Sequence, residues 1–155
     1  MLHIRSATPT DLDFIVGANK RLAEETESLR LDEATLHAGV SAILNGTAPG
    51  RYWVAEWNGE VVGQLAITFE WSDWRNRMVW WIQSVYVVAE ARKHGAFRAL
   101  YEHTRREAHT AGAGGLRLYV DTTNTRAQAV YTAMGMNGGH YRVFEDMFAE
   151  PARAN

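Results

Sequence analysis

The sequence contains no cysteine and only three prolines among its 155 residues. The absence of cysteine excludes disulfide bonds and thiolate metal sites. No apolar run approaches the roughly 18 residues that a membrane span requires. The N-terminus also lacks the apolar stretch of a signal peptide. We therefore expect a protein that functions in the cytoplasm and does not associate with a membrane.

Neither sign of charge is in large excess, since 16 Lys and Arg face 18 Asp and Glu and the formal net charge is −2. A protein that holds nucleic acid by bulk charge needs a basic surplus, so we expect no nucleic-acid partner. The histidines show no metal-ligand spacing, because His103 and His109 fall on different faces of one predicted helix. We expect no metal. The length suits a single domain over residues 1–155.

The sequence does contain a clear succession of strand and helix patterns. Asn58-Gly59 lies between two apolar, β-branched runs, which predicts a type I′ hairpin. Residues 78–88 are apolar at both parities, as in a central strand covered on both faces. Early hairpins followed by crossovers predict an α/β chain with a mixed sheet. The predicted order is strand 2–7, helices 8–28 and 32–44, strands 51–57, 60–71 and 78–88, helix 96–112, strand 114–121, helix 124–134 and strand 140–148.

A cationic turn precedes the third predicted helix and is the first candidate site. Arg92, Lys93 and His94 come directly before Gly95, and the strand at residues 85–87 leads into them. A helix N-terminus exposes unpaired N–H groups and carries about half a positive charge, so it can hold a phosphate. The alternative is a solvated charged loop that leads into an amphipathic helix.

A second constellation lies on the last predicted helix. Asn124, Ala127, Tyr131 and Gly135 fall on one face of that helix. Taken alone, the pattern also fits an N-cap, two packing residues and a glycine stop.

Together these segments resemble the GNAT N-acetyltransferases. Residues 92–97 resemble that family's acyl-CoA loop, Q/R-x-x-G-x-G/A, and residues 124–136 resemble its later motif, N-x-x-A-x-x-x-Y-x-x-x-G-F/M. The element order fits from His3 to Phe148, and the chain looks most like the spermidine/spermine and thialysine type of small-amine acetyltransferase. The resemblance implies the GNAT acyl-CoA N-acyltransferase fold, a mixed, mostly antiparallel sheet with a splayed parallel strand pair and about four flanking helices.

The resemblance also implies a chemistry. Acetyl-CoA would be the co-substrate, and its acetyl group would pass directly to the primary amine of a small molecule. Tyr131 would act as general acid, since a phenol with a pKa of about 10 suits a departing thiolate of similar basicity. The residues that it assigns to cofactor binding are Val85, Tyr86, Val87, Arg92, Lys93, His94, Gly95, Ala96, Phe97, Arg98, Asn124 and Ala127.

The sequence departs from the family pattern at two places. Phe97 occupies the last position of the loop motif, where the family has a small residue. Gln83 and Ser84 align with an acidic pair of the small-amine enzymes, so neither can serve as a carboxylate base. Glu70 is the acidic candidate for the general base and would act through a water molecule. The alternative is that Glu70 is a solvent-exposed turn residue. Candidate substrate-binding residues are Gln83, Ser84, Glu27 and Trp71.

Two alternative functions and one question about assembly stay open from the sequence. The missing strand carboxylates and Phe97 also fit a non-catalytic acyl-CoA-binding or regulatory domain on the same fold. An open groove in place of a closed pocket would indicate a protein or peptide amine as acceptor. The aromatic strands also offer a face for a homodimer, as in other members of the superfamily.

Overall fold

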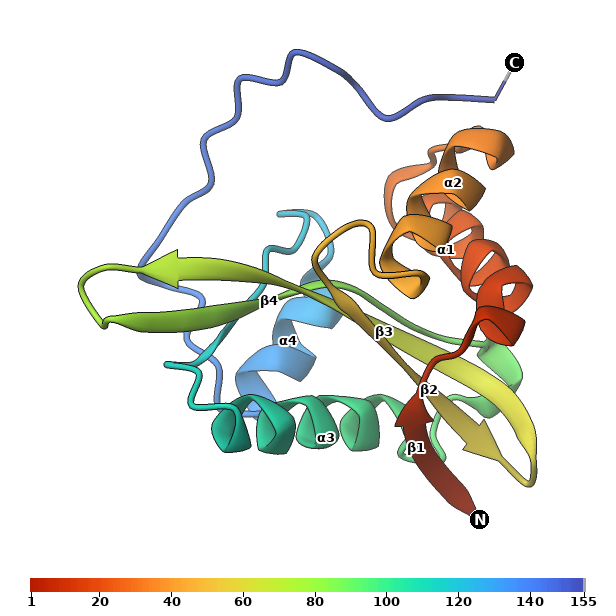
Figure 1. Ribbon diagram of the computed structural model, residues 1–155, viewed down its shortest axis with the longest axis horizontal. Coiled ribbons are helices and arrows are strands. Elements are labelled where there is room, and N and C mark those ends of the chain that lie inside the picture. The colour runs from red at the N-terminus through yellow and green to blue at the C-terminus, as the bar shows by residue number, and fades with distance from the viewer. Residues whose placement is uncertain (155) are drawn as a thin grey trace.

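A five-stranded sheet in the order β1-β2-β3-β4-β5 forms the centre of the protein (Figure 1), in a computed structural model that describes residues 1–154. The strands are β1 (Leu2–Ser6), β2 (Arg51–Trp57), β3 (Glu60–Ser72), β4 (Arg77–Val87) and β5 (Leu116–Arg117). The helices are α1 (Leu12–Glu27), α2 (Glu33–Leu44), α3 (Ala96–Thr110) and α4 (Thr125–Ala133), with short 3-10 turns at Pro9–Asp11 and Ala89–Ala91.

The sheet is mixed, as expected. Strands β1 to β4 pair antiparallel, whereas β4 and β5 run parallel. The parallel pairing is limited to Trp80 with Leu116 and Trp81 with Arg117. Beyond Trp81 the two strands separate, so the splayed parallel pair implied by the resemblance is present. Its open end lies toward Val87, where β4 leads to α3.

Local turn and cap signals account for most element boundaries. Asn58 and Gly59 both have positive φ, 51° and 87°, which confirms the predicted hairpin turn between β2 and β3. The Oδ2 of Asp32 accepts a hydrogen bond of 2.9 Å from the Thr35 N–H at the start of α2. The Oδ1 of Asn124 accepts one of 3.1 Å from the Ala127 N–H at the start of α4.

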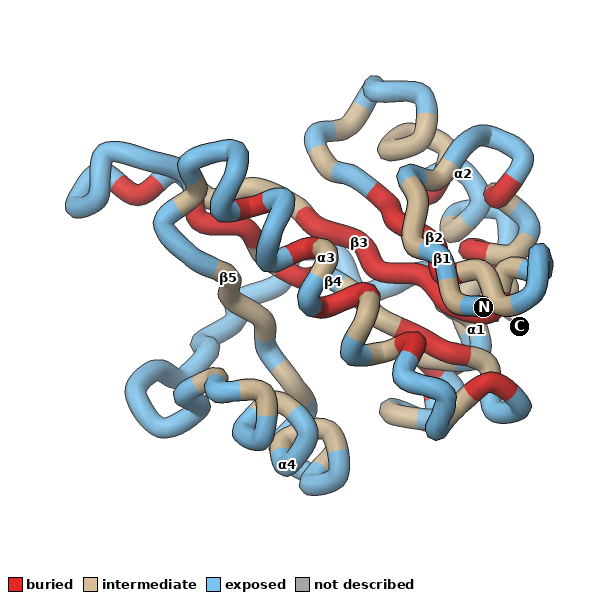
Figure 2. Tube along the Cα trace, turned by 90° about the horizontal axis from the view of Figure 1, so that it is seen from below, coloured by how far each residue is buried: buried red, intermediate tan, exposed pale blue. Residues whose placement is uncertain are grey.

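The helices cover the two faces of the sheet. Helix α3 packs on one face, where Leu65, Ile67, Trp80, Ile82 and Leu100 form the larger core. Helices α1 and α2 cover the other face over a smaller core that contains Ile15, Val16, Val40, Val54 and Ala66. Figure 2 shows the buried residues concentrated along β2, β3, β4 and α3, whereas α4 contains none. Among the described residues, no helix is long and apolar enough to cross a membrane.

A bulge interrupts β4 next to the predicted acceptor site. Ala66 of β3 pairs with Ser84, and Ile67 pairs with Ile82, so Gln83 is the extra residue of the bulged strand. Bulges bend a strand and change the direction of its side chains, and they occur often beside active sites. Here the bulge leaves Gln83 exposed and Ser84 partly buried.

Two predicted strands differ from the structure. The strand expected over 114–121 is reduced to Leu116–Arg117, because β4 diverges from its continuation. The strand expected over 140–148 is wrong for this chain, since these residues form no ladder with any described residue. A strand needs a partner edge for its hydrogen bonds. This segment instead runs away from β5 toward the loop between α1 and α2, where Arg153 bridges to Leu31.

Candidate functional site

The turn before α3 exposes a row of unpaired backbone donors. Within the described residues, no backbone N–H from Lys93 to Arg98 donates to a backbone or side-chain acceptor, and the first donor of α3 is Ala99, to the Gly95 carbonyl at 2.9 Å. The first turn of α3 contains no acidic residue. Unpaired N–H groups at a helix start attract anions. The predicted anion site therefore has the donors that it needs.

The backbone of this turn adopts an uncommon conformation. Gly95 has φ 82° as the residue before α3, and Lys93 has φ 76° although it carries a side chain. A non-glycine residue at positive φ costs about 1–3 kcal/mol, and such residues cluster at ligand sites. The positive φ values of Lys93 and Gly95 make the tight turn from which α3 begins.

Arg92 is held in place by a contact with α1. Its Nη2 donates to Glu25 Oε2 at 2.8 Å and its Nε to the Val87 carbonyl at 2.9 Å. The Tyr86 hydroxyl donates to Glu25 Oε1 at 2.9 Å, and the Arg92 guanidinium carbon lies 5.3 Å from the centroid of the Tyr86 ring. Burial raises the pKa of Glu25, but the hydrogen bonds from Arg92 and Tyr86 outweigh it, so its pKa lies below the usual value.

This Glu25–Tyr86–Arg92 cluster links two elements that are distant in the chain. The Tyr86 and Arg92 side chains join the end of α1 to the turn before α3. The Arg92 Nη1 makes no hydrogen bond with a described residue, so the guanidinium keeps donors for a phosphate. The sequence did not indicate this contact of Glu25, since nothing local to residues 24–33 indicates a partner so distant in the chain.

The splayed edge of β4 is open beside the turn. No described residue of β5 pairs with β4 from Ile82 to Val87. Val85 is partly buried on the α3 face, and Tyr86 and Val87 are buried. The unpaired groups along this edge are available to an extended ligand, as predicted for Val85, Tyr86 and Val87.

The α4 residues of the second motif approach the turn through an aromatic contact. The Tyr131 ring lies against Phe97 of α3, with ring centroids 5.8 Å apart. Burial raises the pKa of the Tyr131 phenol to about 12. No described residue makes a hydrogen bond with its hydroxyl. The motif departure at Phe97 thus supports the ring of the predicted general acid.

Asn124 and His94 are two further polar residues of this region, and their side chains make different contacts. Asn124 uses its Oδ1 for the N-cap of α4, which leaves its Nδ2 free for a ligand. The His94 ring stacks on Trp57 at 4.9 Å between ring centroids. His94 thus contributes its backbone to the turn, while its side chain packs against β2.

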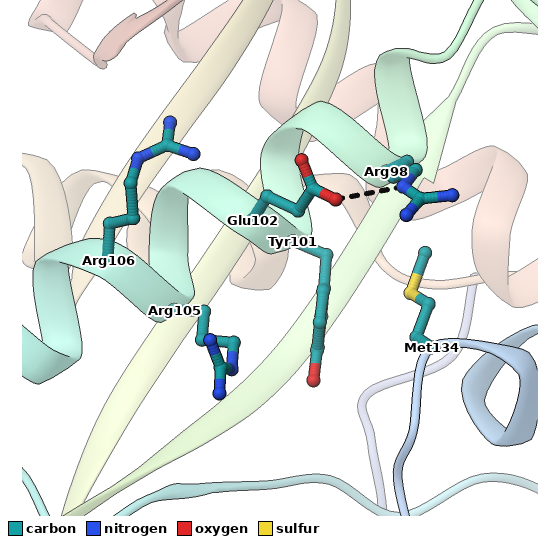
Figure 3. Close-up of a pocket in the computed structure, with 6 residues that line it drawn as sticks. All are labelled: Arg98, Tyr101, Glu102, Arg105, Arg106 and Met134. Atoms are coloured by element: carbon teal, nitrogen blue, oxygen red, sulfur yellow. Dashed lines mark hydrogen bonds and ion pairs between the residues drawn. The ribbon is translucent and has the colours of Figure 1, made fainter.

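A pocket of about 290 Å³ lies along the outer side of α3 (Figure 3). Arg98, Tyr101, Arg105 and Arg106 line it from α3, and Met134 lines it from the end of α4. Glu102 neutralises part of this charge through its 2.8 Å ion pair with Arg98. Arg105, Arg106 and Met134 were not predicted from the sequence. Their signal would have been the spacing of basic residues along the α3 helix.

On the opposite face of the sheet, the acceptor-side residues are linked to their neighbours. The Gln83 Nε2 donates to Thr68 Oγ1 at 2.7 Å, and Ser84 forms a weak hydrogen bond of 3.3 Å with the buried Gln64. Glu70 Oε2 accepts from the Trp81 indole N–H at 3.0 Å, and its other oxygen forms an ion pair with Arg117. Glu70 therefore connects β3, β4 and β5.

The other two predicted substrate residues are not brought together. Glu27 is the exposed last residue of α1. Trp71 is 58% exposed near the tip of the β3–β4 hairpin, which extends away from α1 and α2 (Figure 1).

Comparisons with known proteins agree with this geometry. Residues 18–136 match the Acetyltransferase (GNAT) family. The structure is similar to that of a possible acetyltransferase from Clostridium difficile 630, with 38% identity, a TM-score of 0.89, and 97% of this chain and 99% of that chain covered. It is also similar to the aminoglycoside N-acetyltransferase AAC(6')-Iy in complex with CoA, with 18% identity, a TM-score of 0.79 and 96% of each chain covered. No protein of curated function matches the chain.

Proposed function

Because this chain belongs to the GNAT family and is an acetyl-CoA-dependent N-acetyltransferase, we propose that it transfers the acetyl group to the primary amine of a small molecule, with Tyr131 as the general acid. The observation that carries this proposal is the position of Tyr131. Its ring packs on Phe97 in the first turn of α3, beside the unpaired amides of the turn. This contact supports Tyr131 as a proton donor near the predicted cofactor site.

The raised pKa of Tyr131 keeps its proton in place before the transfer, although it makes the free phenol a weaker acid than the pKa match expected from the sequence. With a pKa of about 12 the phenol stays protonated at neutral pH, so it is always ready to donate. A thiolate leaving group needs such a proton as its bond to the acetyl carbon breaks.

The turn and the α3 pocket support binding of the donor. The amides of Lys93 to Arg98 fit a diphosphate, and Gly95 lets it approach the backbone closely. The arginines of the α3 pocket add positive charge at its side, where a further phosphate would be attracted. The open edge of β4 at Val85 to Val87 offers donors and acceptors to an extended pantetheine arm, with the free amide of Asn124 opposite.

In the transfer step the acceptor nitrogen forms a bond to the acetyl carbon, and the bond between that carbon and the CoA sulfur breaks. A backbone N–H of the open β4 edge near Val85 would stabilise the negative charge that develops on the acetyl oxygen. Tyr131 gives its proton to the sulfur. Glu70 remains the proposed acceptor of the amine's surplus proton, and because both of its oxygens already accept hydrogen bonds the proton would move through water.

The acceptor would lie on the α1 and α2 face, near the bulge. Gln83 is exposed there and has hydrogen-bonding capacity beyond its contact with Thr68. Ser84 adds a hydroxyl whose contact with Gln64 is long. Two neutral polar groups suit a small amine better than a polycation. The similarity to structures described as aminoglycoside acetyltransferases is consistent with a small-molecule amine.

The proposal is tested by CoA thiol release from acetyl-CoA over a panel of amines, amino acids, polyamines, aminoglycosides and peptides. With the best acceptor, we expect Tyr131→Phe to lower kcat about 100-fold while the Kd for acetyl-CoA stays unchanged, because the phenol acts only on the leaving sulfur. Tyr141→Phe is the matched control, since it removes one hydroxyl from an exposed tyrosine and should keep full activity.

Three results would overturn parts of this proposal. Equal kcat in Tyr131→Phe and the wild type, with the absence of a pre-steady-state burst showing that no step after chemistry limits turnover, would remove the role of Tyr131. Release with peptides alone would replace the small-molecule acceptor by a protein. Tight acetyl-CoA binding without release for any acceptor would favour a non-catalytic acyl-CoA-binding domain.

A further inference from the structure

The C-terminal end of α1 contains few buried residues. The buried residues of this helix lie in its first half, apart from Ala23. Thr26 uses its hydroxyl inside the helix, through a hydrogen bond of 2.7 Å to the Leu22 carbonyl. The position of this helix end on the sheet therefore depends largely on polar contacts.

Glu25 makes the polar contacts through which the end of α1 meets the sheet. Its Oε1 accepts from the Tyr86 hydroxyl at 2.9 Å, and its Oε2 accepts from Arg92 Nη2 at 2.8 Å. Tyr86 is a buried residue of β4. Arg92 belongs to the turn before α3, and α3 packs on the face of the sheet opposite to α1 (Figure 1). Glu25 thus connects elements from both sides of the sheet.

Arg92 in turn contacts the open edge of β4. The Val88 N–H donates to the Val62 carbonyl of β3 at 2.9 Å. Because neighbouring residues of a strand direct their backbone groups to opposite sides, the Val87 carbonyl faces the open side. Arg92 Nε donates to this carbonyl at 2.9 Å. The guanidinium therefore lies where the open edge of β4 meets the turn with the unpaired amides.

The Glu25–Arg92 ion pair affects orientation more than stability. Its side chains are 45% and 34% exposed, and ion pairs with such exposure add little to stability. The guanidinium, however, is a rigid planar fork, so its two contacts with Val87 and Glu25 fix the direction of its remaining donors. A further acceptor can then bind without the cost of ordering a mobile side chain.

We propose that Glu25 is a positioning residue for the diphosphate of acetyl-CoA, that it acts through Arg92, and that donor binding thereby orders the end of α1. The inference rests on the proposed function, in which the turn before α3 holds the diphosphate. A phosphate oxygen would accept from the guanidinium while Glu25 and the Val87 carbonyl keep their hydrogen bonds. Because coupling between two sites is reciprocal, the diphosphate and the end of α1 then stabilise each other.

The sign of one change in affinity separates this role from the opposite one. A carboxylate near the turn also repels phosphate and neutralises Arg92. If Glu25 acted only in that way, its removal would tighten CoA binding. If it positions Arg92, its removal weakens CoA binding although it also removes a negative charge.

Isothermal calorimetry with CoA measures this sign. We expect Glu25→Ala to raise the Kd for CoA about fivefold. Glu24→Ala is the matched control, since it removes the same charge from the exposed neighbouring residue, and should leave the Kd unchanged. In an Arg92→Ala background, Glu25→Ala should have no further effect, because the contact through which it acts is absent. If that background binds CoA too weakly for calorimetry, Arg92→Gln replaces it.

Amide hydrogen exchange measures the ordering of α1. Saturating CoA should slow exchange in a peptide that covers residues 22–29 of the wild type and of Glu24→Ala. The same peptide of Glu25→Ala should exchange equally with and without CoA. Because all samples are saturated, a difference between the variants does not come from weaker occupancy. Circular dichroism checks that each variant is folded.

The outcomes distinguish this inference from the proposed function. A Kd for Glu25→Ala equal to or below that of the wild type overturns the inference. An effect of Glu25→Ala that is equally large without the Arg92 side chain also overturns it, as does exchange at residues 22–29 that CoA leaves unchanged in the wild type. All three results leave the proposed function intact. A wild type that binds no CoA would overturn both.

Discussion

At the residue scale, Gly95 allows the charge of the anion site to be tested separately from its conformation. Gly95 has φ 82°, and a Cβ at this position would meet no atom within 4 Å. Asn and Asp are the residues that best tolerate such a φ and are similar in size. Only Asp adds a negative charge beside the proposed diphosphate. We expect Gly95→Asp to weaken CoA binding about tenfold relative to Gly95→Asn, which corresponds to about 1.4 kcal/mol.

Isothermal calorimetry at two ionic strengths measures this difference. The gap between the two variants should shrink at high salt, because screening weakens the repulsion. Equal Kd values for Gly95→Asp and Gly95→Asn at low salt would contradict a diphosphate at this turn. Comparison of Gly95→Asn with the wild type shows how much of the loss in CoA affinity comes from the backbone conformation of residue 95.

Residues differ in how far their sequence neighbours determine their role. Gly95, Asn124 and Tyr131 could be proposed as site residues from the sequence, because their motifs are short and lie on single turns or helices. The contact of the Arg92 side chain could not be predicted, because its partner Glu25 lies in α1 and only folding brings them together. The contact of Phe97 with Tyr131 joins two helices and could not be predicted from the sequence for the same reason.

At the scale of elements, a buried ion pair joins β1 to the start of α1. The Arg5 guanidinium donates to both oxygens of Asp11, at 2.8 and 2.9 Å, and Asp11 also accepts from the Thr8 N–H at 2.7 Å. The Asp11 side chain is only 5% exposed. We expect Asp11→Asn to lower the free energy of unfolding by about 2 kcal/mol, because hydrogen bonds to a charged group are lost.

The pH dependence follows from the Arg5 hydrogen bonds, which hold the pKa of Asp11 below its usual value. A carboxyl whose pKa is lower in the folded state stabilises the protein above its unfolded pKa. That contribution is lost as the pH falls through the folded pKa. The difference between wild type and Asp11→Asn should therefore be largest near pH 7 and should shrink below a pH of about 4.

Urea unfolding at a fixed protein concentration measures this difference. Asp13→Asn is the control, since Asp13 is exposed in the same first turn and should change stability by less than about 0.5 kcal/mol. A difference that stays constant from pH 7 to pH 3 would contradict the assigned ion pair.

Elements with local signals were predicted well. The β2–β3 hairpin, the Asp32 cap of α2 and the Asn124 cap of α4 depend on residues close in sequence, and all three are present. The strands predicted at 114–121 and 140–148 have equally good alternation. They fail within one chain because a strand forms only where another edge is available, and pattern alone does not reveal the partner.

At the scale of the whole molecule, the homodimer that the sequence predicts would make stability depend on concentration. If the folded state is a dimer and the unfolded state is not, mass action favours unfolding on dilution. Each tenfold dilution removes about 1.4 kcal/mol per dimer, which should lower Tm by about 2 °C for two chains of this size. Differential scanning calorimetry or fluorescence over a hundredfold concentration range measures this slope.

The phenylalanines of the C-terminal tail, residues 140–148, should be required for that slope, since Phe144 is 93% and Phe148 98% exposed within one chain. We expect Phe144→Ser with Phe148→Ser to give a lower Tm that does not change with concentration, because an interface between two chains would lose its largest apolar contacts. Val130→Ser, which removes a partly exposed apolar side chain from α4, should keep the slope of the wild type. A Tm independent of concentration in the wild type would mean that the tail finds its cover within one chain. A concentration-dependent Tm in the double variant would place the interface elsewhere, and in that case the exposed aromatic residues of the β3–β4 hairpin, Trp71 and Trp74, are the next surface to test.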